Sequence, residues 1–173
     1  MLAEKFHVRA LCRIQHHQAY DYDEGRGLWL RRLVFEEEVG NLVTDAGLVA
    51  IHTYIYGTAA QRTAAALGVD GLSYIGLTND AGAPAGGDTT LTGELSADGL
   101  ARAAGTVTLP TGAGTITTVH HEFTYSGGVA QGIQKTALFD AGSGGNMAHE
   151  LLFTQRTLNT SDTITITFQI TLA

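Results

Sequence analysis

The chain has little of several residues that direct folding or chemistry in other proteins. Its 173 residues include one cysteine, two prolines and one tryptophan. A single cysteine excludes an internal disulfide, and Cys12 lies in an apolar segment, so we expect it to be buried in the core. No stretch approaches the ~18 apolar residues of a membrane span, and the N-terminus lacks a secretory signal pattern. We therefore expect a protein that is made in the cytoplasm and folds without disulfides.

Charge is also sparse. Charged residues make up 16% of the chain and hydrophobic residues 44%, a balance typical of a folded protein, and the length suits one domain over residues 1–173. The formal net charge is −7, which repels phosphate backbones and anionic lipid. This balance argues against nucleic-acid and membrane partners, and we expect the partners to be proteins.

Alternating residues predict strands at both ends of the chain. From Ile164 to Leu172 every second side chain is apolar and the others are threonine or glutamine, the pattern of a half-buried strand. The same alternation from Phe6 to Ile14 predicts a second strand. Residues 28–35 also look extended, so the first two strands should form a long N-terminal hairpin with a solvated, mobile polar tip between them.

One helix is predicted near residues 44–56. Thr44 suits the N-cap position, and Asp45 in the first turn complements the helix dipole. Leu48, Ile51 and Ile55 recur at helical spacing and should form its apolar stripe, although Gly47 weakens it. The alanine-rich residues 59–68 fit either a short second helix or an irregular connection.

The rest of the sequence predicts short strands separated by glycine-containing turns. A long surface loop, residues 78–93, follows the first of them and is a candidate contact surface. The expected strands cover residues 72–77, 100–109, 115–125, 131–139 and 149–154. About eight strands at this spacing predict an all-β fold, an antiparallel β-sandwich or jelly roll with one helix.

Two groups of side chains could in principle bind metal ions. His16 with His17 and His120 with His121 are adjacent pairs, and neighbours on a strand point to opposite faces, so neither pair is expected to share an ion. Asp21, Asp23 and Glu24 resemble the start of a calcium loop. The later acidic ligands are missing, which favours a solvated hairpin turn.

No sequence pattern predicts catalysis or cofactor binding. Ser143 lies outside a G-x-S-x-G elbow, and neither a P-loop nor a dinucleotide fingerprint occurs. Glu36, Glu37 and Glu38 fit either an acidic contact patch or the solvated end of a strand, and we favour the strand end. The sequon at Asn159 is expected to mark only a turn. We predict no catalytic, cofactor-binding or metal-ligating residues and no enzymatic activity.

The order of segments resembles a family of small structural proteins of tailed bacteriophages. The similarity lies in NLVTDAGLVAI, LSYIGLTNDAGAPAGGDTTLTGE, ALFDAGSGGNM and DTITITFQITL, which follow the N-terminal hairpin. It implies a virion protein made in the host cytoplasm, either a capsid decoration or a head-to-tail accessory. Such a protein would dock onto major capsid or tail proteins of a symmetric lattice as a homo-oligomer, in one version a trimer. We expect the first hairpin and the loop of residues 78–93 to make the contacts between subunits.

Two other functions remain open. A carbohydrate- or receptor-binding module of a tail fibre would stack sugar rings on exposed aromatic side chains. Its candidate residues are Trp29, Tyr54, Tyr56, Tyr74 and Tyr125. A small metal-dependent hydrolase is the third and weakest alternative.

Overall fold

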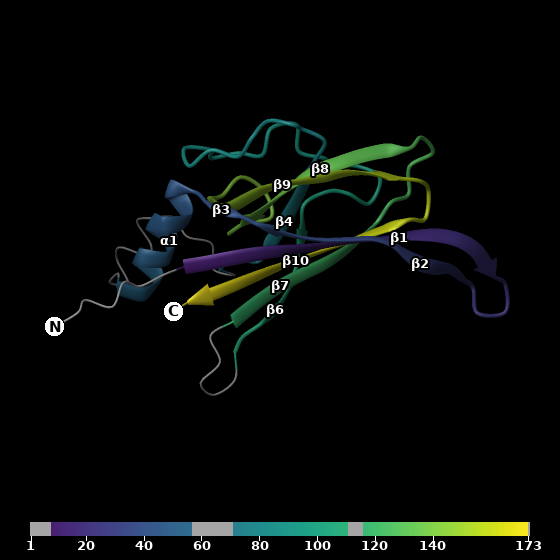
Figure 1. Ribbon diagram of the computed structural model, residues 1–173, viewed down its shortest axis with the longest axis horizontal. Helices are drawn as coiled ribbons and strands as arrows, with labels where there is room; N and C mark the ends of the chain where they lie inside the picture. Colours follow the sequence, from purple (N-terminus) through teal and green to yellow (C-terminus); the bar gives the residue numbers. More distant parts are fainter. Residues whose placement is uncertain (1–7, 57–70, 111–115, 173) are drawn as a thin grey trace.

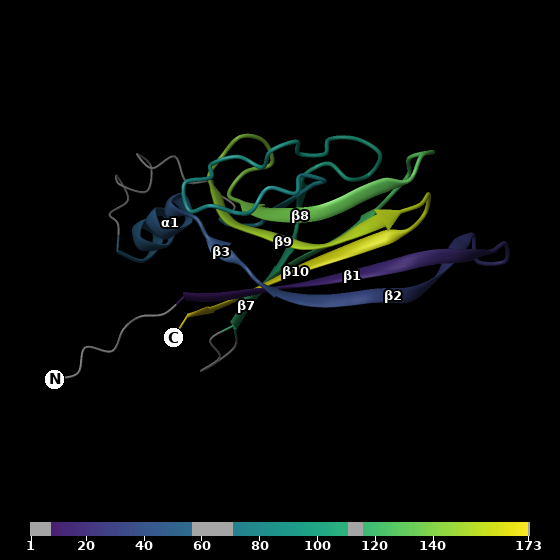
Figure 2. The ribbon, with the colours of Figure 1, turned by 45° about the horizontal axis from the view of Figure 1, so that its top comes forward.

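Two antiparallel five-stranded sheets pack face to face in the computed structural model (Figures 1 and 2). The structure describes residues 8–56, 71–110 and 116–172. The predicted all-β sandwich is therefore confirmed. The described residues form ten strands, because residues 42–43 add a short strand and the segment predicted at 100–109 is divided into two.

The two sheets are built from strands that lie far apart in the sequence. Sheet A has the order β2-β1-β10-β7-β6, and sheet B the order β3-β9-β8-β4-β5. The strands of sheet A are β1 (Val8–Asp23), β2 (Leu28–Gly40), β6 (Thr106–Thr108), β7 (Ile116–Thr124) and β10 (Thr163–Leu172). Those of sheet B are β3 (Leu42–Val43), β4 (Tyr74–Thr78), β5 (Ala103–Ala104), β8 (Gln131–Phe139) and β9 (Met147–Leu158).

Both sides of the sandwich are closed by a chain segment that passes from one sheet to the other. On one side β2 leads through Asn41 into β3, and on the other β5 leads through Gly105 into β6. Gly105 must be small, because a Cβ there would lie 2.8 Å from a Val119 methyl carbon and 3.0 Å from the His120 carbonyl oxygen. Such crossing segments turn the corners of a sandwich whose sheets share strands.

The core lies between the sheets and follows the predicted alternation. Cys12 and Ile14 of β1 face Ile164, Ile166 and Phe168 of β10, and all five side chains are fully buried. The burial expected for Cys12 is confirmed, and it raises the pKa of the thiol far above its usual value. The same cluster includes residues from other strands, among them Phe123, Ile133, Leu138, Leu151 and Leu158.

The N-terminal hairpin differs from its prediction in one respect. The polar stretch after Ile14 is not a loop: β1 continues to Asp23, and the turn to β2 takes only residues 24–27. Strand pairing overrides the low strand propensity of this stretch, because β1 and β2 pair as far as Asp23 with Leu28. Figure 1 shows the hairpin projecting at the end of the molecule opposite α1.

The helix α1 (Asp45–Tyr56) begins at the predicted cap. The Thr44 hydroxyl accepts a hydrogen bond from the Gly47 amide at 3.0 Å. The predicted apolar stripe is wrong, because Leu48 is exposed while Gly47 and Ala50 are buried. A Cβ on Gly47 would lie 2.2 Å from the Ala148 carbonyl oxygen, so close approach to β9 selects small residues. The side chain of Ile55 and residues 59–68 lie outside the described parts of the chain.

Candidate functional site

The end of the β1–β2 hairpin extends beyond the body of the sandwich. Strand β10 begins at Thr163, which pairs with His17 of β1, so residues 18–23 of β1 pair only with β2. We call residues 18–32 the arm. A two-stranded ribbon has a marginal stability by itself, so the arm depends on its attachment to sheet A.

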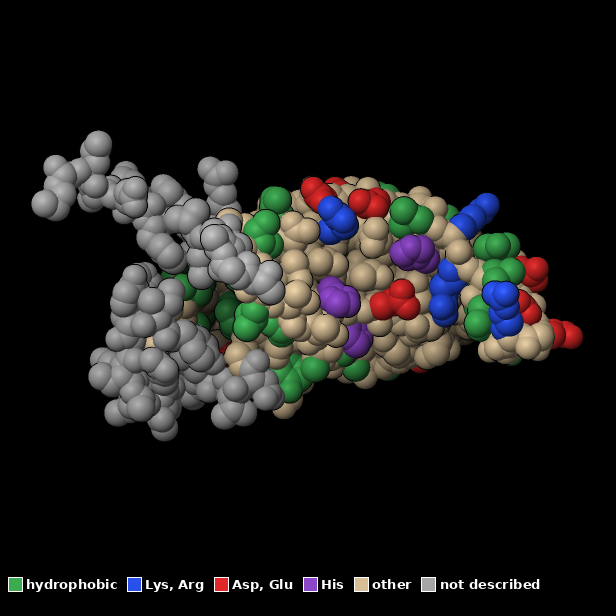
Figure 3. Space-filling model, turned by 90° about the horizontal axis from the view of Figure 1, so that it is seen from below, with side chains coloured by type: hydrophobic (Ala, Val, Ile, Leu, Met, Phe, Trp, Pro, Cys, Tyr) green, Lys and Arg blue, Asp and Glu red, His purple; other side chains and the backbone are tan. Residues whose placement is uncertain are grey.

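The arm exposes large apolar side chains. Tyr22 and Trp29 are direct cross-strand partners whose rings meet edge to face at a centroid distance of 5.4 Å, yet they are 46% and 42% exposed. Tyr20 and Leu28 are also exposed. Figure 3 shows hydrophobic side chains gathered at this end among acidic and basic ones. A cluster of this kind is typical of an interaction surface.

The charge of the arm differs from that of the whole chain. Three acidic residues are balanced by three arginines, so the arm is formally neutral within a chain of net charge −7. The acidic residues are Asp21, Asp23 and Glu24, and the basic ones are Arg26, Arg31 and Arg32. The arm therefore lacks the net negative charge with which the rest of the chain repels acidic partners.

A buried carboxylate anchors the base of the arm. Asp162, in the turn before β10, accepts hydrogen bonds from the backbone amides of Ala19 and Asn159 at 2.8 Å each. Its other contact is the ring of His16, at 3.3 Å. Arg31 on β2 donates to the carbonyl oxygen of Ser161 in the same turn. These contacts hold both strands of the arm to the β9–β10 turn.

The acidic residues near the arm tip form a turn, as the sequence favoured. Asp23 accepts the Arg26 amide with both its carbonyl oxygen and its carboxylate, and the Gly27 amide also bonds to its carbonyl. Arg26 reaches the same carboxylate at 3.6 Å. The carboxylate of Asp23 is thus engaged within the turn itself. The predicted turn at Asn159 is also present, before β10.

Of the three proposed sugar-stacking residues whose side chains the structure describes, only Trp29 is exposed. Tyr125 is buried, and its hydroxyl donates to the Val129 carbonyl oxygen. Tyr74 is half-buried against the apolar cluster of sheet B. Trp29 is exposed on the arm, and the side chains of Tyr54 and Tyr56 lie outside the described set.

The second predicted contact segment lies flat against sheet B. All but the first residue of the predicted loop, residues 78–93, belongs to a longer segment, residues 79–102, which we call the strap. Its first part crosses the outer face of β4 and β8 (Figure 2), and Leu95 and Leu100 of its second part pack into the core between the sheets. Leu91 of the strap is buried in a small cluster with Ala137, Phe139 and Met147. The strap therefore covers an apolar face that would otherwise meet water.

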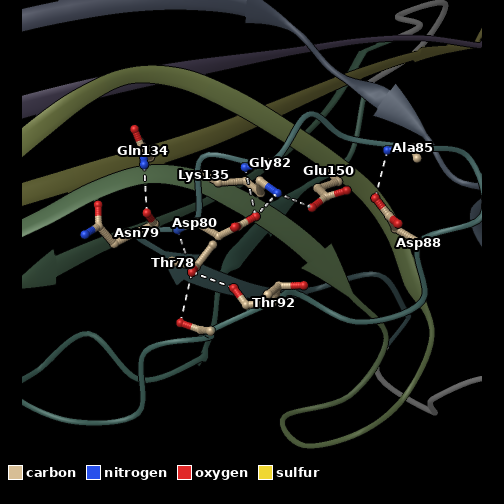
Figure 4. A network of polar contacts seen from close by, with 11 residues as sticks. Thr78, Asn79, Asp80, Gly82, Ala85, Asp88, Thr92, Gln134, Lys135 and Glu150 are labelled. Atoms are coloured by element: carbon tan, nitrogen blue, oxygen red, sulfur yellow. Dashed lines mark hydrogen bonds and ion pairs between the residues drawn. The ribbon is translucent and has the colours of Figure 1, made fainter.

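An ion network fixes the strap to the sheet, and Figure 4 shows it from close by. The Lys135 ammonium of β8 lies 2.5 Å from the Asp80 carboxylate and 3.2 Å from Glu150 of β9. Burial lowers the pKa of Lys135 less than the two carboxylates raise it, so it stays charged. Burial raises the pKa of Glu150, and a hydrogen bond with Asp88 of the strap raises it further, against the effect of Lys135.

The strap is also tied down by uncharged contacts. The Thr78 hydroxyl bonds to the carbonyl oxygens of Thr92 and Gly93 and accepts the Asp80 amide. Further along, Asp88 accepts the Ala85 amide at 2.8 Å. The strap is therefore an integral layer of the fold as well as an exposed surface.

The adjacent histidines lie as their spacing predicted, with one correction. His120 is exposed and His121 packs edge to face on Phe123, so the pair does not converge. His16 does not lie near a mobile tip: it is buried at the arm base, because β1 continues through this stretch. Among the described residues, no three histidine, cysteine or acidic side chains group closely enough to hold a metal ion.

His149 is a buried residue that sequence reasoning did not single out. It is fully buried on β9 beside Phe168, and neither ring nitrogen has a hydrogen-bond partner. Burial lowers its pKa to about 4. Asp162 and Lys135 were not predicted either. Their contacts are with residues distant in the sequence, which a local pattern does not reveal.

A shallow pocket of about 280 Å³ lies beside the strap, between Glu94, Arg102 and Ser143. Arg102 binds both oxygens of Glu94 at 2.7 Å and donates to the carbonyl oxygen of Gly144. Its guanidinium also stacks over Phe139 at 3.4 Å. Arg102 thus holds residues 140–145 against the strap, and its guanidinium nitrogens already donate hydrogen bonds within the protein.

The three glutamates lie in the last five residues of β2. Glu36 and Glu38 are exposed and pair with Arg13 on the outer face of sheet A, and Glu37 accepts the amide and the hydroxyl of Thr154 on β9. The solvation expected of a strand end therefore holds for Glu36 and Glu38, whereas Glu37 is half-buried against sheet B.

The described residues contain no helix that is long and apolar enough to cross a membrane. Comparison with protein-family models gave no match, and a search of curated proteins gave no significant similarity.

Proposed function

We propose that the protein is a structural component of a phage-type virion that acts by docking onto other proteins. In this role it decorates the capsid or joins head to tail, and it works as a homo-oligomer on a symmetric lattice of major capsid or tail proteins. It transforms no substrate. It is made in the host cytoplasm and ends in the particle.

The observation that carries the proposal is the arm. A hairpin anchored at its base by Asp162 presents the exposed pair Tyr22 and Trp29 away from the body of the sandwich. Aromatic side chains at an exposed tip supply much of the binding energy at protein interfaces. On a lattice the same contact is repeated, so a weak individual interface still gives firm attachment.

The buried polar groups support a structural role. Lys135, Glu150 and Arg102 are engaged in holding the strap, and Asp162 holds the arm. Each of these groups has a conformational task that needs no substrate. Shifted pKa values also occur in structural networks, and burial together with the ion pair between them accounts for those of Lys135 and Glu150.

The test measures binding of the purified protein to assembled particles that lack it. We expect co-sedimentation with particles, and we expect Tyr22→Ser with Trp29→Ser to weaken it at least about tenfold, as for loss of interface aromatics. Val129→Ser is the matched control, because Val129 is 81% exposed outside the arm. Absence of binding to capsid and to tail, with the fold intact by circular dichroism, would overturn the proposal.

A carbohydrate- or receptor-binding module is the second candidate, favoured by the exposure of Trp29 beside Tyr22. Trp29 is the single tryptophan of the chain, so its fluorescence reports on the arm alone. Quenching or a blue shift on titration with host surface polysaccharide supports this candidate. An unchanged fluorescence spectrum with the polysaccharide, together with binding to particles, supports the structural virion component instead.

A further inference from the structure

From the free edge of β2 we propose that two copies of this chain pair through antiparallel β2 strands, joining their A sheets into one continuous sheet. This inference adds a symmetric interface to the proposed function and does not depend on it. The surface concerned is the side of β2 that faces away from β1, from Arg31 to Glu38.

Strand β2 is a long edge. It has 13 residues and lies at the end of sheet A, so in the described chain no strand pairs with its outer side. Natural proteins blunt such edges with proline, charged side chains or bulges. Strand β2 has no proline and no lysine, and its charges leave the apolar centre of the edge uncovered. Leu33 and Val34, at the middle of this edge, are 48% and 39% exposed. An exposed apolar edge with unpaired backbone groups favours the addition of another strand.

The sequence of this edge is complementary to itself. Residues 31–38 read Arg-Arg-Leu-Val-Phe-Glu-Glu-Glu, with basic residues before an apolar centre and acidic residues after it. When two such strands run antiparallel about the centre, the arginines of each copy lie opposite the glutamates of the other. Opposite charges across a strand pair stabilise it, and a two-fold axis uses each contact twice.

The faces of the strand agree with this pairing. Arg31, Glu36 and Glu38 pair with Ala19, Gln15 and Arg13 of β1, which are alternate residues, so all three project from the outer face of sheet A. On the opposite face, Arg32 pairs with Gln18 and Glu37 pairs with Ile14. Each face therefore carries both signs of charge, on opposite sides of the centre.

The charges within one copy are not balanced along the edge. Arg13 lies 2.6 Å from Glu38 and 3.7 Å from Glu36, so one guanidinium serves two carboxylates. Arg32 donates to Gln18 and Arg31 to a backbone carbonyl, so neither arginine has a carboxylate bonded to it within the described chain. A second copy supplies the missing opposite charge at both ends of the pairing.

A bulge at Val34 places the two-fold axis. His16 pairs with Phe35 and His17 with Leu33, so Val34 is an extra residue in β2 with no direct partner on β1. The bulge lies between the basic and acidic halves, at the centre of the pairing. Central residues of the two copies then lie within the ~5 Å Cα separation of an antiparallel pair, where a disulfide fits.

The first experiment measures mass in solution by sedimentation velocity at about 50 µM, a concentration that populates interfaces of micromolar affinity. We expect a dimer. Arg31→Glu with Arg32→Glu should weaken it at least about tenfold by repulsion from the glutamates. Glu37→Lys with Glu38→Lys, the residues opposite Arg32 and Arg31, should weaken it as well, and an equimolar mixture of the two variants should form a heterodimer. Arg26→Glu, the same change in the turn, is the control.

The second experiment tests the geometry by cross-linking. Val34→Cys, next to the two-fold axis, should form an intermolecular disulfide under mild oxidation. Leu33→Cys, whose copies lie too far apart across the pair, and Val129→Cys should not. Cys12 is buried and serves as an unreactive background.

Several outcomes overturn the inference. They are a monomer or a trimer of the unchanged chain, a dimer that the charge reversals leave intact, or failure of Val34→Cys to cross-link. Each variant is first shown to keep the circular dichroism spectrum of the parent. A monomer that still binds particles would refute the β2 pairing and support the proposed function. A dimer that binds no particle would refute the proposed function and support the β2 pairing.

Discussion

The arm and the strap are two polar segments whose composition marks both as contact surfaces, and they relate to the core in opposite ways. The strap buries Leu91 against sheet B and sends Asp80 and Asp88 to Lys135 and Glu150. The arm buries little beyond its base, and its apolar side chains face solvent. The strap stabilises the fold, whereas the arm draws stability from the fold and offers its surface to a partner.

This difference matters for the choice of mutations. Removing the strap would uncover an apolar face and a buried ion network, so a loss of binding after truncation would not identify a contact. Removing side chains from the arm tip leaves the core intact. Single substitutions, for which the free energy of unfolding and the binding to a partner are both measured, therefore show the roles of the two segments better than deletions do.

The largest effect is expected in the strap network. Lys135→Met leaves Glu150 buried beside Asp88 without its cation, and breaking a buried ion pair costs about 3 kcal/mol or more. Urea denaturation at pH 7 measures the loss. Lys135→Met with Glu150→Met should recover most of it, because both buried charges are then gone.

The control for that change is Arg26→Met, which removes an exposed cation from the turn of the arm. Its effect should stay within about 0.5 kcal/mol, as for other surface substitutions. Equal losses for Lys135→Met and Arg26→Met would contradict the difference drawn between the two segments.

The loss of stability at low pH should come more from His149 in sheet B than from His16 at the base of the arm. Burial lowers the pKa of His149 to about 4, and the unfolded chain binds that proton near pH 6.5. Stability is therefore lost as pH falls from about 6.5 towards 4, by about 3 kcal/mol in all. Burial also lowers the pKa of His16, but contact with Asp162 opposes the shift.

His149→Leu tests this assignment, since leucine cannot take up a proton and fills a similar volume. The stability of the variant, measured by urea denaturation from pH 7.5 to pH 4, should fall less steeply than that of the parent. Parallel curves for the two proteins would show that another group causes the acid sensitivity.

Local patterns in the sequence predict the sandwich and the helix cap well. Alternation from Ile164 to Leu172 defines β10, and Thr44 begins α1 as its capping chemistry requires. The continuation of β1 to Asp23 could not be read this way, because pairing with β2 stabilises a stretch of low strand propensity. The burial of Gly47 depends on the approach of β9, which no local pattern reveals.

The position of the candidate site in the sequence could be predicted, but the contacts that hold it could not. The hairpin follows from two alternating segments joined by polar residues, and so does its exposure. Asp162 bonds to Ala19, which lies 143 positions earlier in the sequence, and Lys135 bonds to Asp80, which lies 55 positions earlier. Such contacts depend on the order of strands in the sheets, which alternation does not specify.

The smallest effect on global stability is expected at the arm base. Asp162→Asn keeps one carbonyl oxygen but puts an amide group where a carboxylate oxygen accepted a bond, which costs about 1 to 2 kcal/mol. The arm should respond more than the core does: hydrogen exchange at the Ala19 amide and along the arm should accelerate, while β8 and β9 keep their protection. Asp21→Asn on the exposed arm is the control and should change neither. If exchange rises equally in the arm and in sheet B, the arm is no separate unit, and its aromatic tip loses the independence on which docking depends.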